Sequence, residues 1–187
     1  MKSFIPTENY NLSLLKVHGE DVIISKNVEI KRPNLFSIGN HVCIDSGFYI
    51  TTKAQLGDYI HIGPHVCVIG GEKGLLKMGN FTNIAVGGKI ICGSDEFMGK
   101  GFSFPTLEKK YRDKLIISPV VIEDFVAIGA SVTILPGVTL GIGSVIGACS
   151  LVTKDTAPWT IYKGVPAMPI KKRSKEKMLL LAKKLGY

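Results

Sequence analysis

The segment IEDFVAIGASVTILPGVTLGIGSVIGACSLVTKD, residues 122–155, places an aliphatic side chain at every sixth position. A small or aliphatic residue recurs four positions after most of these, and glycine commonly follows the first position. A helix of 3.6 residues per turn loses phase with such a repeat, and one alternating strand of this length would far exceed ordinary strands. The repeat therefore predicts a solenoid, in which each unit is a short strand with a corner and equivalent side chains stack between coils.

The same repeat runs through most of the chain. Ile24 and Ile30 are expected to form a first turn in which the repeat is less regular. The later aliphatic positions are Ile38, Ile44, Ile50, Leu56, Ile62 and Val68, then Met78, Ile84 and Ile90, and then Ile116, Ile122, Ile128, Ile134, Leu140, Ile146 and Val152.

Two steps break the six-residue rhythm. Val68 and Met78 are ten residues apart, which predicts that four extra residues bulge out around GGEKG. Ile90 and Ile116 are twenty-six residues apart, which predicts a loop extruded at residues 93–115. A regular solenoid surface offers few pockets, whereas a loop held by a rigid scaffold can build one, so the chemistry is expected near this loop.

The late repeats, followed by YKGVPAMPIKKR at residues 162–173, resemble the hexapeptide-repeat acyltransferases. The resemblance spans roughly residues 20–173 and implies an all-β solenoid, a left-handed parallel β-helix with three six-residue sides per coil. It also implies a homotrimer, with acetyl-CoA in the groove between neighbouring β-helices and transfer of the acyl group to an amine or a hydroxyl. The expected organisation is an N-terminal segment at 1–20, a β-helix domain at 21–170 and a basic C-terminal helix at 171–187.

Composition limits the other classes of protein. The chain has 187 residues, 45% of them hydrophobic, which is enough for one core. It shows neither a leader-like apolar stretch nor a run long enough to span a membrane, so we expect a cytoplasmic protein with no membrane insertion. The four cysteines lie far apart without a paired motif, which predicts reduced thiols and no metal site.

The net charge of +8 resides mainly in the last residues of the chain. Residues 171–187 hold seven basic residues and one acidic residue, and therefore six of the eight net charges. Such a tail can bind nucleic acid, a membrane surface or a small phosphorylated ligand, and its apolar stripe at helical spacing is typical of a packing face. The body has no second basic patch, so we do not expect nucleic acid as a partner.

Acidic residues open the extruded loop. If the coil arithmetic continues beyond Ile90, Asp95 lies beside Glu72 on the next coil, with backbones about 5 Å apart. Two neighbouring carboxylates raise the pKa of one of them, which suits a proton acceptor near neutral pH. The alternative is that Asp95, Glu96 and Glu72 are solvated loop acids.

Two histidines lie in GDYIHIGPHV. By the same arithmetic His61 points outward between Cys43 and Asn83, and His65 stacks between two glycines, which leaves room for a ligand. The alternative for each is an ordinary surface histidine. Because His61 and Asp95 leave different sides of the coil, we expect them to meet only across a subunit boundary.

Within the family, the chain is most similar to N-acetyltransferases of nucleotide-linked amino sugars of the anthrose and viosamine pathway type. In that group HI, GGE and an acidic pair followed by Phe recur in this order, and the matching residues here are His61, Glu72, Asp95 and Glu96. One other branch of the family carries a catalytic histidine just before the extruded loop, where this chain has CGSDEF. Another branch carries a histidine ahead of the unit that here reads LGDYIHI, and this chain has ITTKAQ there. The absence of both histidines favours an amine acceptor, because a free amine needs less help from a base.

The resemblance and the residues together give a set of candidate site residues. Those expected to be catalytic are His61, Asp95 and Glu72. Those expected to bind substrate are Glu96, Ser94, His65 and Asn83. Those expected to bind the coenzyme, either through backbone groups of the late coils or through cations near its phosphates, are Ala130, Ala148, Lys154, Tyr162, Pro166 and Lys171.

The resulting expectation is an acetyl-CoA-dependent N-acetyltransferase. Its acceptor would be a nucleotide-linked sugar, dTDP-linked by resemblance, with an amine at carbon 3 or 4, made for a surface polysaccharide such as an O-antigen. One alternative is an O-acetyltransferase of a sugar or another small hydroxyl compound. The other is a β-helix module that binds without catalysis.

Overall fold

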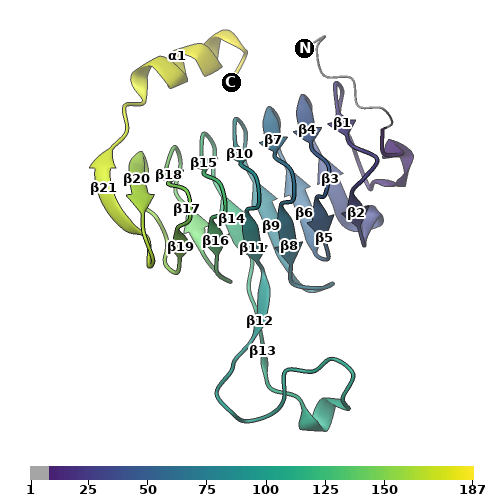
Figure 1. The fold of residues 1–187 in the computed structure, drawn as a ribbon. Helices are drawn as coiled ribbons and strands as arrows, with labels where there is room; N and C mark the ends of the chain where they lie inside the picture. The colour runs from purple at the N-terminus through teal and green to yellow at the C-terminus, as the bar shows by residue number, and fades with distance from the viewer. Residues whose placement is uncertain (1–8) are drawn as a thin grey trace.

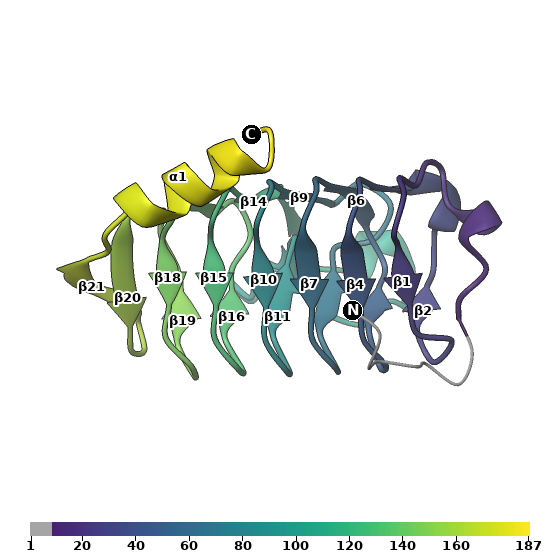
Figure 2. The ribbon, with the colours of Figure 1, turned by 90° about the horizontal axis from the view of Figure 1, so that it is seen from above.

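A computed structural model describes residues 9–187 of the chain. These residues wind into a β-solenoid with three flat faces, each built from short strands that stack along the solenoid axis (Figure 1). A hairpin projects from one side, and the C-terminal helix lies along the coils, as the view from above shows (Figure 2). The predicted fold class is confirmed.

Each face is one sheet of strands from successive coils. The first face contains β1 (Ile23–Ile24), β4 (Val42–Ile44), β7 (Ile60–Ile62), β10 (Asn83–Ile84), β15 (Ala127–Ile128), β18 (Val145–Ile146), β20 (Thr160–Lys163) and β21 (Met168–Lys172). The second contains β2 (Glu29–Ile30), β5 (Tyr49–Ile50), β8 (Cys67–Ile69), β11 (Lys89–Ile91), β16 (Thr133–Ile134) and β19 (Leu151–Val152). The third contains β3 (Phe36–Ile38), β6 (Lys53–Leu56), β9 (Leu75–Met78), β14 (Val120–Ile122) and β17 (Thr139–Leu140).

The core is a set of stacked aliphatic columns, one beneath each face. On the first face every strand pairing between coils is parallel as far as β20, and it aligns Ile44, Ile62, Ile84, Ile128 and Ile146. All five side chains are buried. The six-residue spacing therefore predicted both the inward positions and the register.

The four extra residues after Val68 are also confirmed. Ile62 pairs with Ile84, twenty-two residues later, whereas Ile44 pairs with Ile62, eighteen residues later. The difference is taken up by a turn in which Gly74 donates its N–H to Gly71, and Gly71 has a φ of +62°. Glycine adopts this left-handed conformation at little cost.

The extruded segment is an antiparallel hairpin rather than a simple loop. Its stem pairs β12 (Gly93–Asp95) with β13 (Leu115–Ile117), and a short 3₁₀ helix, Lys109–Tyr111, lies near its tip. Ile116, which the repeat predicted as a core position, instead pairs with Ser94 in the stem and is 42% exposed. Its six-residue distance from Ile122 is a coincidence of spacing, since β14 is the strand that returns to the core.

The C-terminal helix begins later than predicted. Residues 171 and 172 belong to β21, which pairs antiparallel with β20, and helix α1 spans Glu176–Lys184. The start was predicted too early because a run of cations does not distinguish an exposed strand from a helix. Beyond α1, Tyr187 packs edge-on against the rings of Tyr59 and Phe81, and its hydroxyl donates to Asp58.

The segment before the first strands packs onto the first coil. It contains a 3₁₀ helix at Leu12–Leu14, where the Asn11 side chain accepts the N–H of Ser13, and a second 3₁₀ helix follows at Pro33–Leu35. Val17 forms a parallel bridge with Ser37, so part of the predicted N-terminal segment joins the solenoid. Within residues 9–187 no helix is long and apolar enough to cross a membrane.

Candidate active site

His61 lies on the outer surface of the first face. Strand β7 buries Ile60 and Ile62 on either side of it, so alternation along the strand turns the imidazole outward. Cys43 and Asn83 are its partners on the neighbouring coils, as predicted. The His61 side chain is 57% exposed, and its Nε2 lies 3.0 Å from Oδ2 of Asp45. A carboxylate in this position orients the imidazole ring through this contact.

His65 lies at the corner between the first and second faces. Its ring fills the space that a side chain at Gly47 would need, so that glycine leaves no room for a ligand. On the other side, a Cβ built at Gly87 would meet only Ser131, at 3.4 Å. Only the Gly87 side of the predicted glycine column is therefore open.

Asp95 ends β12, where the hairpin leaves the solenoid. Its side chain is partly buried, yet within residues 9–187 no hydrogen bond or ion pair reaches its carboxylate. The backbone carbonyl of Asp95 does accept a hydrogen bond, from the hydroxyl of Ser94 at 3.1 Å. A carboxylate at a rigid stem without an internal partner is free to bind a ligand.

Glu96 continues the hairpin ladder, with its N–H donated to the carbonyl of Lys114 at 2.8 Å. Because side chains alternate along an extended strand, Asp95 and Glu96 point to opposite sides of the stem. The Nζ atoms of Lys114 and Lys100 lie 3.9 Å from Oε1 and Oε2 of Glu96, respectively. The Oε2 atom is nevertheless buried without a hydrogen bond partner. Buried polar atoms are rarely left unpaired, so this oxygen has capacity for a donor from outside the chain.

Coil arithmetic placed Asp95 in the coil register next to Glu72, but Asp95 pairs with Leu115 in the hairpin instead. Glu72 lies exposed in the turn at residues 70–74, whereas Asp95 belongs to a hairpin that has left the coil register. The last coil contact before the hairpin is between Gly70 and the Cys92–Gly93 backbone. The prediction failed because it extended the parallel register past Ile91, where antiparallel pairing begins.

The predicted coenzyme residues gather around the late coils. Ala130 and Ala148 occupy equivalent corners, and the Ala130 carbonyl accepts the N–H of Cys149 at 2.8 Å. Lys154, Pro166 and Lys171 are exposed near the end of the solenoid. Tyr162 is buried, and its hydroxyl accepts the N–H of Ala157 at 2.9 Å. This contact suits packing better than direct contact with a coenzyme.

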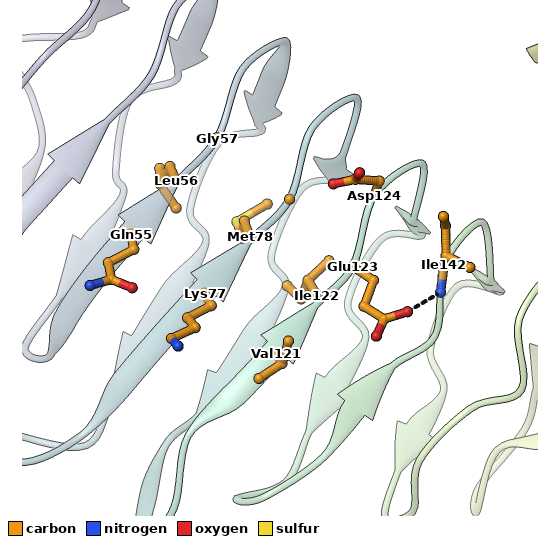
Figure 3. Close-up of a pocket in the computed structure, with 11 residues that line it drawn as sticks. Gln55, Leu56, Gly57, Lys77, Met78, Val121, Ile122, Glu123, Asp124 and Ile142 are labelled. Atoms are coloured by element: carbon orange, nitrogen blue, oxygen red, sulfur yellow. Dashed lines mark hydrogen bonds between the residues drawn. The ribbon is translucent and has the colours of Figure 1, made fainter. Parts of the chain in front are cut away.

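An open groove of about 530 Å³ lies elsewhere, on the third face. It runs across β6, β9 and β14, with Lys77 and Glu123 at its walls, and Glu123 accepts the N–H of Ile142 at 2.6 Å (Figure 3). None of the predicted site residues lines it. The groove carboxylates of Glu123 and Asp124 each accept a backbone N–H, from Ile142 and Asn80, whereas Asp95 at the hairpin has no partner within residues 9–187.

Asp45 is the neighbour of His61 that the sequence did not predict. Cys43 and Asp45 leave the same outer surface, and donor atoms of Cys43, Asp45 and His61 all lie within 4.8 Å of one another. The stacking arithmetic had already placed Cys43 beside His61. Counting two residues further along the strand would have found Asp45.

Coils built from in-register six-residue units, with one extruded hairpin, define a hexapeptide-repeat β-solenoid. The dTDP-4-amino-4,6-dideoxy-D-glucose acyltransferase of Escherichia coli is 34% identical over 162 residues, which cover 84% of this chain and 82% of that enzyme. No family model matches the chain.

Solved structures agree with this similarity. The N-acyltransferase AntD from Bacillus cereus, in complex with dTDP and 3-hydroxybutyryl-CoA, superposes with a TM-score of 0.88 at 32% identity, over 95% of this chain and 96% of AntD. A serine-to-alanine variant of AntD was solved in complex with dTDP-4-amino-4,6-dideoxyglucose and coenzyme A. It gives a TM-score of 0.89 at 33% identity, over 96% of this chain and 98% of the AntD variant. The chain belongs to the hexapeptide-repeat acyltransferases.

Proposed function

We propose that this protein transfers an acetyl group from acetyl-CoA to the amino group of a dTDP-linked 4-amino or 3-amino deoxysugar. The main support is that similarity to AntD covers 95% to 96% of the chain, and that AntD structures contain dTDP, a dTDP-linked amino sugar and coenzyme A. The product would supply a surface polysaccharide. We infer a cytoplasmic site of action, where both substrates are made.

The amine is proposed to bind at the neck of the hairpin. Asp95 offers a partly buried carboxylate without an internal partner, which can accept a hydrogen bond from the amine and then its proton. The amine nitrogen forms a bond to the thioester carbon, and the C–S bond of acetyl-CoA then breaks. Backbone N–H groups would stabilise the oxyanion that forms between these two steps.

The other predicted substrate residues are proposed to hold the sugar and its nucleotide. Glu96 has a buried oxygen able to accept a hydroxyl or amine donor. Ser94, His65 and Asn83 would contribute polar contacts, and Glu72 a more distant carboxylate. Lys154 and Lys171 are cations near the solenoid end, where phosphates of the coenzyme would gain charge-assisted hydrogen bonds.

A homotrimer is proposed because one chain does not complete the site. His61 lies on the first face in β7, whereas Asp95 leaves from the end of the second face with the hairpin. Phe97 is 70% exposed and Phe104 59%, and the hairpin extends well away from its own solenoid (Figure 1). A neighbouring subunit would cover these rings and bring its His61 toward Asp95.

The test is a thiol-release assay with acetyl-CoA and matched acceptors. The panel contains dTDP-4-amino-4,6-dideoxyglucose, its 3-amino isomer, and a hydroxyl analogue without the amine. The proposal predicts release of coenzyme A with one amine and background release with the hydroxyl compound. Turnover of the hydroxyl compound alone would assign O-acetylation instead. Replacing acetyl-CoA by 3-hydroxybutyryl-CoA determines the acyl group.

A further inference from the structure

Three different metal-ligand side chains converge on the outer surface of the first face. Cys43 and His61 are direct register partners on β4 and β7, and Asp45 follows Cys43 by two residues, on the same side of the chain. The thiol of Cys43 donates to Oδ1 of Asp45 at 4.0 Å, and Nε2 of His61 lies 3.0 Å from Oδ2. All three groups therefore already surround one small volume.

The spacing suits a tetrahedral transition-metal ion. In such a site the donor atoms lie about 3.3 to 3.6 Å apart, given bond lengths of about 2.0 to 2.3 Å. Here the corresponding atoms lie within 4.8 Å of one another. Side-chain movements of about 1 Å would close the difference. His61 is 57% exposed and can move once its hydrogen bond to Asp45 is released.

We propose that Cys43, Asp45 and His61 bind one Zn²⁺ ion reversibly. A thiolate, an imidazole and a carboxylate form a donor set that favours Zn²⁺ or Co²⁺ over Mg²⁺ or Ca²⁺, which prefer oxygen ligands alone. Three protein ligands leave a fourth position for water. The ion is a regulatory ligand and has no part in the acyl transfer.

Binding exchanges a proton for the metal ion. The metal ion binds the thiolate form of cysteine, so the Cys43 thiol must give up its proton when the ion enters. When the S–Zn bond forms, the S–H bond breaks and the proton goes to solvent. The imidazole and the carboxylate bind through lone pairs, and the hydrogen bond between His61 and Asp45 is lost.

Zinc and acyl transfer would compete for His61. With its nitrogen on the metal, the imidazole is no longer oriented by Asp45 and cannot accept a proton or a substrate hydrogen bond there. Zn²⁺ is therefore expected to inhibit the enzyme. Inhibition rests on the proposed function, whereas metal binding does not.

The test uses Co²⁺ as a spectroscopic probe on the reduced, metal-free full chain. Wild type should develop a thiolate-to-cobalt absorption band that saturates at one equivalent of Co²⁺. Added Zn²⁺ should displace the Co²⁺ and abolish the band. The Cys43→Ser variant should lose the band. Cys149→Ser is the matched control, because Cys149 is exposed, far along the chain and outside the cluster, and this variant should keep it.

Two results would overturn the assignment. One is a wild-type protein without the cobalt band, and the other is a Cys43→Ser variant that retains it. In the thiol-release assay, Cys43→Ser should keep its basal rate while needing on the order of 100-fold more Zn²⁺ for half inhibition. Equal inhibition of both proteins would reject the regulatory role, and the cobalt result stands even if no acceptor is turned over.

Discussion

The late coils, residues 120–152, and the hairpin, residues 93–117, use similar residues for opposite purposes. In the coils each inward side chain contacts equivalent side chains above and below it, and Ile122, Ile134 and Leu140 are almost completely buried. In the hairpin, Ile116 is 42% and Phe97 70% exposed. Stacking fixes the residue type in every coil but imposes nothing on the hairpin. The Asp95 carboxylate, which has no partner within residues 9–187, is therefore tolerated there at little cost to the fold.

The largest difference between the two regions should appear when Asp95 is neutralised. Asp95→Asn is expected to lower kcat/KM for the amino sugar by about 10²- to 10⁴-fold, the range for loss of a positioned proton acceptor, or roughly 3 to 5 kcal/mol in the transition state. Its melting temperature should not change, because the carboxylate has no partner within the described chain. A variant with wild-type kcat/KM would move the proton transfer to His61.

The isoleucines of the two regions provide the next comparison. Ile128→Ala removes an almost completely buried side chain in the middle of a column of the late coils and should cost about 2 to 5 kcal/mol of unfolding free energy. Ile116→Ala, the same substitution in the hairpin stem, should cost less than about 0.5 kcal/mol. Chemical denaturation measures both. Equal losses would mean that the hairpin shares the solenoid core.

The smallest effect is expected at the C-terminus. The hydrogen bond from Tyr187 lowers the pKa of Asp58, and the same bond raises the pKa of Tyr187 to about 12. The contribution of Asp58 to folding stability is present above its unfolded pKa and is lost as pH falls through the lower folded pKa. That of Tyr187 is present below its unfolded pKa of about 10 and is lost as pH rises through about 12.

The Tyr187→Phe substitution tests this hydrogen bond. Because Tyr187 is at the surface, the variant should melt only slightly below wild type at neutral pH, and the difference should vanish in acid. The phenyl ring of the variant keeps its packing against Tyr59 and Phe81, so a melting temperature equal to that of wild type at neutral pH would contradict a contribution from the hydrogen bond.

Periodicity predicted the solenoid because stacked coils repeat the same inward positions at a fixed spacing along the chain. Knowing that Ile44 is inward is enough to place Ile62, and a four-residue excess before Met78 is enough to predict the turn at Gly71. The same rule misassigned Ile116, since spacing alone does not distinguish a core position from a coincidence. Nothing local marks where parallel stacking gives way to an antiparallel stem.

The site was less predictable than the scaffold. The contacts around His61 follow the coil register, so its neighbours could be predicted from the sequence. The relation of Glu72 to Asp95 could not, because it depends on the direction in which the hairpin leaves Gly93. In the proposed homotrimer, contacts between subunits would decide whether His61 and Asp95 meet, and the repeat within one chain does not predict such contacts.

Removing the hairpin tests the division between scaffold and chemistry most directly. Gly93 and Ile117 are cross-strand partners, so a two-residue glycine-rich turn can join them in place of residues 94–116. The measurement is amine-dependent thiol release by this variant, on a sample whose circular dichroism and melting temperature match wild type. The account predicts a folded solenoid with no amino-sugar acetylation. A folded variant that still acetylates the amino sugar would contradict it.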